Sequence, residues 1–238
     1  MATVVLVRHG RTSANASGTL AGRTPGVRLD DTGTAQAERA GARLAAVPLA
    51  AIVSSPLERC RQTARAIARA HPAAPRVSSD RGLTECDYGE WQGRPLKELA
   101  KEKLWKVVQG QPSAAVFPGG ESMATMQARV VDAVRRHDAA VEAEHGPHAV
   151  WVAVSHGDLI KAVLADALGM HLDLFQRIQV DPASVSVVRY TEARPYVLAT
   201  NSHEGDLGWL APQPARRRTR RSTDAAVGGG AGPSPAAP

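Results

Sequence analysis

The sequence predicts an α/β protein: a three-layer αβα sandwich with a mostly parallel central sheet, helices on both faces and a hairpin at one edge. Two observations predict this class. Short continuous runs of Val, Leu and Ala alternate with longer amphipathic segments, a pattern typical of strands buried on both faces between helices. Near the end of the chain, two β-branched runs separated by a turn at Pro195 predict the edge hairpin.

The predicted elements alternate along the chain. Strands are expected at residues 3–8, 49–55, 76–79, 149–155, 184–190 and 196–200, and helices at 33–47, 56–70, 95–109, 122–144 and 157–169. Pro56 suits the first turn of its helix, where the missing N–H costs nothing. Ser122 is expected to cap a helix N-terminus. The stretch from Arg94 to Phe117 is predicted to form one amphipathic helix and a short loop.

The composition excludes several classes of protein. With 43% hydrophobic and 22% charged residues in 238, the chain is typical of a globular protein with one sizeable domain. No apolar run is long enough to span a membrane, and no signal peptide is expected. The two cysteines, Cys60 and Cys86, lack the spacing of a zinc site or disulfide framework. We expect a cytoplasmic protein without a metal or cofactor.

Most of the positive charge lies in the last segment of the chain. Residues 211–238 contain five arginines and one aspartate, so the net charge of +6 leaves only +2 for residues 1–210. The segment is rich in Pro, Gly, Ala and Arg and has little to bury. We therefore predict a catalytic domain over 1–210 and a disordered, solvated tail over 211–238. Nucleic acid and membrane are not expected partners.

Polar residues stand where the predicted parallel strands end. His9 follows the first strand, and His156 follows the strand at 149–155. Because the carboxyl ends of parallel strands meet at one edge of a sheet, these two histidines are expected to lie close together. Helix N-termini start at the same edge and favour an anion, as do Arg8 and Arg59. Taken alone, however, each Arg-His-Gly or Ser-His-Gly triplet is more typical of an ordinary strand end.

Other motifs point away from rival chemistries. The nucleophile elbow G-x-S-x-G, the P-loop and the dinucleotide motif G-x-G-x-x-G are all missing. His145 and His148 lie in a polar turn and are expected to be solvated rather than metal ligands. Cys60 is expected to be a small buried helix residue, and Cys86 a packing neighbour of the site.

Five segments together resemble a known family. They are "RHGRTSAN" (8–15), "SSPLERCRQTA" (54–64), "LTECDYGEWQG" (83–93), "PGGES" (118–122) and "SHGDLIKAVL" (155–164). They stand in the order found in the histidine phosphatase superfamily, which includes the cofactor-dependent phosphoglycerate mutases. The resemblance runs from residue 3 to about residue 200. The chain looks closest to an actinobacterial-type branch labelled phosphomutase or phosphatase.

The resemblance implies a role for each matching residue. His9 would be the nucleophile that becomes phosphorylated, and Glu85 the proton donor. Arg8, Arg59 and His156 would bind the phosphoryl group. The residues expected to line the phosphate or substrate pocket are Thr12, Asn15, Gly22 and Gly157. No metal ion is implied.

These residue types suit phosphoryl transfer. Arginine matches phosphoryl oxygens with planar paired donors, and its charge is expected to keep His9 neutral and nucleophilic. A carboxylic acid such as Glu85 can protonate the leaving alkoxide. In some relatives an acidic residue directly after the second histidine donates the proton. Gly157 stands there, so Glu85 is favoured, and a contribution from Asp158 is left open.

Three functions remain open at this stage. A phosphatase acting on a small phosphorylated metabolite is favoured, because "ECDYG" replaces the "ERHYG" typical of the phosphoglycerate mutases. A phosphomutase is the alternative, with basic residues between Arg94 and Phe117 that could hold a bisphosphate: Lys97, Lys101, Lys103 and Lys106. A non-catalytic module that binds a phospho-ligand or a protein is the third. The substrate and the oligomeric state, a dimer included, are left open.

Overall fold

The computed structural model describes residues 2–73 and 75–211. The predicted tail from residue 212 onward lies outside them. Six strands form one sheet in the order β3-β2-β4-β1-β5-β6. They are β1 (Thr3–Arg8), β2 (Leu49–Ser54), β3 (Val77–Ser79), β4 (Val150–Ser155), β5 (Val185–Arg189) and β6 (Tyr196–Ser202). The first four are parallel and the last two form the antiparallel edge hairpin, which confirms the predicted fold class.

Strand β1 lies in the middle of the sheet and explains the opening apolar run. Val4 and Leu6 point into one hydrophobic cluster, whereas Val5 and Val7 point into the other, and all four are buried. Successive side chains of a strand face opposite sides, so a strand covered on both faces needs apolar residues at every position.

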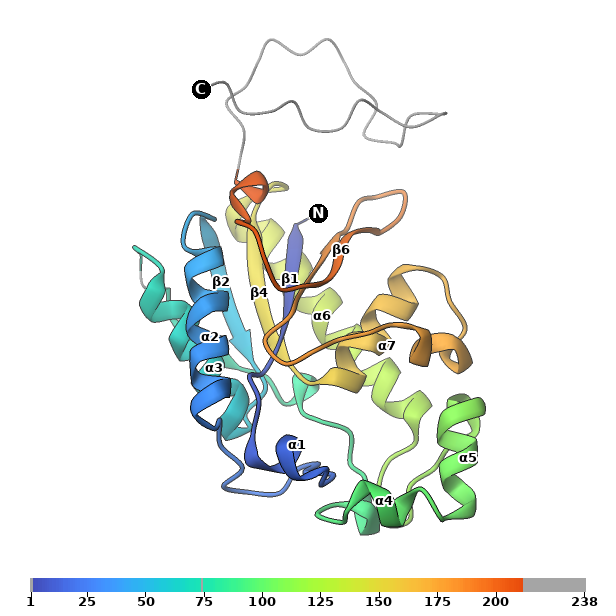
Figure 1. The fold of residues 1–238 in the computed structure, drawn as a ribbon. Coiled ribbons are helices and arrows are strands. Elements are labelled where there is room, and N and C mark those ends of the chain that lie inside the picture. Colours follow the sequence, from blue (N-terminus) through green and yellow to red (C-terminus); the bar gives the residue numbers. More distant parts are fainter. Residues whose placement is uncertain (1, 74, 212–238) are drawn as a thin grey trace.

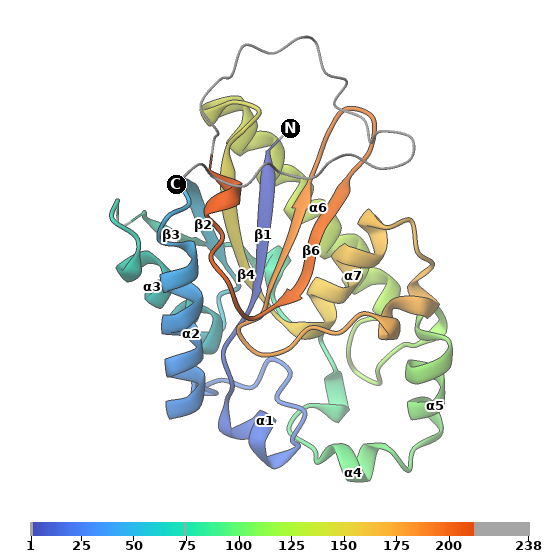
Figure 2. The same cartoon turned by 45° about the horizontal axis from the view of Figure 1, so that its top comes forward.

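Two pairs of helices cover the sheet. Helices α2 (Asp31–Leu44) and α3 (Glu58–Ala70) pack on one face, and α6 (Met123–His145) and α7 (Gly157–Ala167) on the other (Figures 1 and 2). Helix α6 begins after Ser122, whose Oγ accepts a hydrogen bond from Thr125 N at 3.0 Å, as the sequence predicts. Short 3₁₀ turns occur at Arg81–Leu83, Gly89–Trp91, Pro112–Ala114, Leu172–Arg177 and Gly208–Leu210.

Two predicted helices differ from the structure. Helix α3 begins at Glu58, so Pro56 lies before its first turn rather than in it. The single helix predicted at 95–109 is instead two helices, α4 (Leu96–Leu99) and α5 (Lys103–Gly110). Leu99 and Val108 belong to the same hydrophobic cluster. Nine residues along one continuous helix, at 100° each, would put them on opposite faces, so a break between them allows both to be buried.

The carboxyl ends of the parallel strands meet at one edge of the sheet, at the bottom of Figure 1. The short helix α1 (Ser13–Ser17) follows β1 there. The sequence analysis does not predict this helix. Helix α4 lies beyond the same edge (Figure 1). In the part of the chain that the structure describes, no helix has the length and apolar character needed to cross a bilayer.

Candidate active site

His9 stands at the carboxyl end of β1, next to the end of β4. The parallel register pairs Arg8 with Ser155, and the backbone N–H of His9 donates to the Ser155 carbonyl at 3.0 Å. This pairing brings His9 beside His156, with ring centroids 5.2 Å apart. The two histidines that are far apart in the sequence therefore meet, as the strand-end argument predicts.

The hydrogen bonds of His9 fix which ring nitrogen carries the proton. Its Nδ1 lies 2.7 Å from the carbonyl oxygen of Gly10, and a carbonyl only accepts, so Nδ1 carries the hydrogen. Its Nε2 lies 3.2 Å from Arg59 Nε, and a guanidinium only donates. The Nε2 lone pair of His9 therefore faces the Arg59 guanidinium.

Gly10 is required by close packing. A Cβ at this position would run into the carbonyl oxygen of Gly33, at the start of α2. The backbone N–H of Gly10 donates to Thr63 Oγ1 at 3.1 Å, which ties the chain after His9 to helix α3. A glycine after the histidine thus lets two helices approach the reactive ring.

Arg59 links the two histidines. Its side chain is 2% exposed, and its Nη2 donates to the Gly22 carbonyl at 2.8 Å and to His156 Nδ1 at 3.2 Å. Since Nδ1 accepts from Arg59, the proton of His156 is on Nε2, 2.8 Å from Ser55 Oγ. His156 is completely buried and lies behind Arg59 rather than among the residues that line the pocket.

Arg8 holds a second guanidinium at the pocket. Its Nη1 donates to the Val180 carbonyl at 2.8 Å. Its Nε is buried and has no hydrogen-bond partner among the residues described. Within the same residues, neither Arg8 nor Arg59 forms an ion pair with a carboxylate. A buried donor without an acceptor is costly, and two uncompensated guanidiniums favour an anionic ligand.

Both histidines are held neutral. Burial lowers the pKa of His9 well below 6.5, and the charges of Arg59 and Arg8 lower it further. Burial likewise lowers the pKa of His156, with Arg59 as the next cause. The expectation that His9 is neutral agrees with this direction, but removal from water contributes more than the guanidiniums.

Glu85 is a buried carboxyl group at the pocket. Glu85 is 9% exposed. Burial, followed by the charge of Asp158, raises the pKa of Glu85 from 4.5 to about 7. Arg59 and Arg8 oppose this rise. Its Oε1 accepts from the Cys86 backbone N–H at 3.0 Å, and its Oε2 lies 3.6 Å from His156 Nδ1. Near neutral pH the group can therefore both carry and release a proton.

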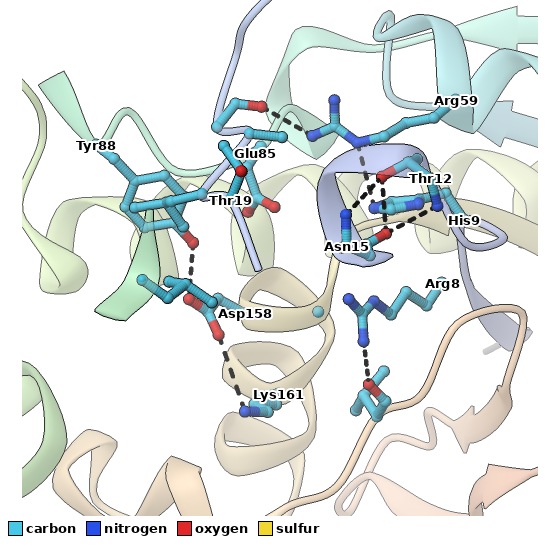
Figure 3. A pocket seen from close by; sticks show the side chains of 16 residues that line it. Arg8, His9, Thr12, Asn15, Thr19, Arg59, Glu85, Tyr88, Asp158 and Lys161 are labelled. Carbon is cyan, nitrogen blue, oxygen red and sulfur yellow. Dashed lines mark hydrogen bonds and ion pairs between the residues drawn. The ribbon is translucent and has the colours of Figure 1, made fainter. Parts of the chain in front are cut away.

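A pocket of about 220 Å³ joins these groups (Figure 3). Thr12 and Asn15 reach it from the start of α1, where Thr12 Oγ1 donates to Asn15 Oδ1 at 2.9 Å and accepts from the Asn15 backbone N–H at 3.2 Å. Of the nine site residues expected from the sequence, eight line the pocket: Arg8, His9, Thr12, Asn15, Gly22, Arg59, Glu85 and Gly157.

Comparisons with known proteins agree with this geometry. Residues 4–203 match the family model of the histidine phosphatase superfamily, branch 1. The chain belongs to the histidine phosphatase superfamily. It is an enzyme that hydrolyses phosphate monoesters, so a non-catalytic binding module is no longer needed to explain the site.

The relatives of this histidine phosphatase include phosphatases and a mutase. It is 32% identical to the phosphoserine phosphatase 1 of Hydrogenobacter thermophilus, over 84% of this chain and 92% of the relative. It is also 32% identical to the probable phosphoglycerate mutase GpmB of Yersinia enterocolitica, over 81% of this chain and 87% of that protein. The solved structure of YhfR from Bacillus stearothermophilus superposes with a TM-score of 0.75 at 26% identity, covering 88% of this chain and all of that one.

In this histidine phosphatase, the loop that carries Glu85 is held by Arg23, a residue that the sequence analysis does not single out. Arg23 Nε donates to the Glu85 carbonyl at 2.8 Å, and its Nη atoms pair with Asp87 at 3.1 Å and Glu121 at 3.0 Å. Arg129 Nη2 donates to the same oxygen of Glu121, Oε1, at 2.7 Å, and Arg129 Nε donates to Oε2 at 3.3 Å. Arg23 directly follows Gly22, one of the residues expected to line the pocket, and only that position could have suggested it.

The mouth of the histidine phosphatase pocket holds further polar groups. Tyr88, Asp158 and Lys161 line it together with Thr19 and Val180. Asp158, left open by the sequence, accepts from the Tyr88 hydroxyl at 2.7 Å. In the described ranges 2–73 and 75–211, no cluster of three or more His, Cys, Asp or Glu side chains could hold a metal ion.

Proposed function

We propose that this histidine phosphatase hydrolyses the phosphate monoester of a small metabolite in two steps, with a phosphoryl group carried transiently on Nε2 of His9. One observation carries the assignment. The Gly10 carbonyl holds the proton of His9 on Nδ1, which leaves the Nε2 lone pair facing the guanidinium of Arg59. The same pocket is lined by Arg8, whose buried Nε has no hydrogen-bond partner among the residues that the structure describes.

In the first step, Arg8 and Arg59 bind the phosphoryl oxygens in place of their present partners and offset their negative charge. The Nε2 lone pair of His9 forms a bond to phosphorus, and the ester P–O bond breaks. The leaving alkoxide takes the proton of Glu85. A low pKa keeps the His9 lone pair available, and the raised pKa of Glu85 keeps its proton in place.

In the second step, the Glu85 carboxylate takes a proton from water. The water oxygen attacks phosphorus, the bond from phosphorus to His9 Nε2 breaks, and inorganic phosphate is released. His156 acts through Arg59, because it does not line the pocket and is buried against Arg59 and Ser55. Helix α7 begins directly after His156, and Gly157 brings its first turn to the pocket, which further favours a bound phosphate.

Hydrolysis is favoured over a mutase reaction by the position of the lysines. Lys97, Lys101, Lys103 and Lys106 are all exposed, and none of them lines the pocket. A mutase that retains a bisphosphate intermediate needs cations around its second phosphate. The only lysine among the pocket-lining residues that the structure describes is Lys161, which lies beside the carboxylate of Asp158.

The experiment compares two leaving groups in the Glu85→Gln variant. An alkyl phosphate needs a proton on its leaving oxygen, so its rate should fall by roughly 10²–10⁴. The phenolate of para-nitrophenyl phosphate leaves without one, so phosphorylation of His9 should be far less impaired and phosphorylated His9 should accumulate. Rapid-quench measurement separates the steps. Equal losses for both substrates in the phosphorylation step would remove Glu85 from the acid role, and Asp158 or Asp87 would be tested next.

A further inference from the structure

The pocket has two ends with different charge. Arg59, His9 and Arg8 gather on one side, here called the inner end, whereas Tyr88, Asp158 and Lys161 lie on the other side, here called the outer end (Figure 3). Asp158 stands in the first turn of α7 and Lys161 one turn later, so their side chains project from the same face of that helix.

The outer end carries a loose ion pair. Lys161 Nζ lies 3.9 Å from Asp158 Oδ1, which is longer than a hydrogen bond. Lys161 also donates to Gln176 Oε1 at 3.0 Å, and Asp158 Oδ2 accepts from Tyr88 at 2.7 Å. An ammonium has three donors and a carboxylate has about four acceptor sites, so both groups retain capacity for a ligand.

The balance of charge differs between the two ends. The two guanidiniums at the inner end match the two negative charges of a phosphate dianion. At the outer end, the charges of Asp158 and Lys161 cancel. A ligand group with one net charge would approach one partner and be repelled by the other about 4 Å away, and such repulsion is strong where the groups are partly withdrawn from water.

We infer that the outer end is a subsite for the non-phosphate part of the substrate, and that it selects a group with no net charge that places a donor next to an acceptor. This inference rests on the proposed phosphatase function. A hydroxyl of a polyol meets both demands, since it can donate to Asp158 while it accepts from Lys161. The ammonium and carboxylate of an amino acid meet them as a pair.

The test uses four primary alkyl phosphates that differ mainly in the charge of the distal group. Glycerol 3-phosphate and phosphoserine carry no net distal charge, 3-phosphoglycerate carries a negative one, and phosphoethanolamine a positive one. The wild-type enzyme should show a kcat/KM at least tenfold higher for the better of the two uncharged substrates than for either charged one. A wild-type preference for a charged substrate would overturn the inference.

Two charge-removing variants provide the sharper readout. Lys161→Gln leaves Asp158 uncompensated, so the kcat/KM ratio of phosphoethanolamine to 3-phosphoglycerate should rise at least tenfold. Asp158→Asn leaves Lys161 uncompensated, so the same ratio should fall at least tenfold. Because the ratio compares two substrates in one protein, a changed pKa of Glu85 or a partial loss of folded protein cancels. Ratios that stay constant, or that move in the same direction, would overturn the inference.

A matched control and a double variant complete the design. Lys101→Gln removes an exposed lysine outside the pocket and should leave the ratio unchanged. In the double variant Asp158→Asn, Lys161→Gln, a polyol keeps its hydrogen bonds whereas a zwitterion loses both ion pairs. If the double variant keeps a wild-type preference for glycerol 3-phosphate over phosphoserine, the group that the subsite selects is a polyol. If wild-type enzyme forms no phosphoenzyme with para-nitrophenyl phosphate, the proposed function and the inference both fail. If it does and the ratios do not move, the inference alone fails.

Discussion

Replacement of Glu85 by glutamine should stabilise the protein at alkaline pH but not at acidic pH. Burial, followed by the charge of Asp158, raises the pKa of Glu85 from 4.5 to about 7. The folded state therefore keeps a proton that the unfolded chain releases. Stability from the neutral form is fully present below the unfolded pKa of 4.5 and is lost as pH rises through the folded value of about 7.

The size of the effect follows from the shift. A rise in the pKa from 4.5 to about 7, at about 1.4 kcal/mol for each pKa unit, corresponds to about 3 kcal/mol of unfolding free energy, most of it between pH 5 and 8. Glutamine is neutral throughout, and its oxygen can still accept from the Cys86 N–H. The difference in stability between Glu85→Gln and wild type should grow by about 2 to 3 kcal/mol over that window. At roughly 2 kcal/mol per molar of urea, this is a midpoint shift of slightly more than about 1 M.

The assay is urea unfolding at a series of pH values from 5 to 8.5. Comparing variant with wild type removes the contributions of His9 and His156, whose lowered pKa values act in the opposite direction, because their neutral forms add stability as pH rises. Glu90→Gln, at an exposed carboxyl in the same loop, serves as the control and should give parallel curves. If the Glu85→Gln curve also runs parallel to wild type, the carboxyl is not held protonated and the acid–base assignment is refuted.

Two further predictions concern what the enzyme does not need. Turnover should survive exhaustive treatment with EDTA, since the guanidiniums and helix N-termini supply the charge stabilisation; a loss that Mg²⁺ or Zn²⁺ restores would contradict this. Deletion of residues 213–238 should leave kcat/KM for a small substrate within about twofold of wild type, because we propose that residues 1–210 form the catalytic unit. A twofold change is under about 1 kcal/mol of transition-state free energy. A large drop in kcat/KM would mean that the tail completes the site.

The sequence was sufficient to predict the parts of the fold that depend on periodicity. The unbroken valine run of β1 predicts a strand buried on both faces, and the structure places it in the middle of the sheet. Strand ends fall at a common edge by topology alone, which is why His9 and His156 could be paired across the chain. The resemblance implies a role for Arg59 and none for the nearby Arg61 and Arg65, and the structure buries only Arg59 of the three.

The features that the sequence did not predict depend on tertiary contacts. The carbonyl groups of Val180 and Gly22 orient Arg8 and Arg59, and a backbone oxygen leaves no trace in residue type. The break between α4 and α5 follows from burial of Leu99 and Val108 in one cluster, whereas helical periodicity is a local property. The contact of Arg23 with the Glu85 carbonyl joins residues 62 positions apart, and Arg23 lies outside the five segments that carry the resemblance.

The most direct test of the account is the location of the phosphoryl group during turnover. The enzyme is mixed with para-nitrophenyl phosphate and quenched in alkali within milliseconds, and the phosphorylated peptide is mapped by mass spectrometry and phosphorus NMR. We predict one acid-labile phosphohistidine, at Nε2 of His9, that His9→Ala abolishes while His156 is intact. A phosphoryl group on Nδ1 or on another residue, or full turnover by His9→Ala, would contradict the account.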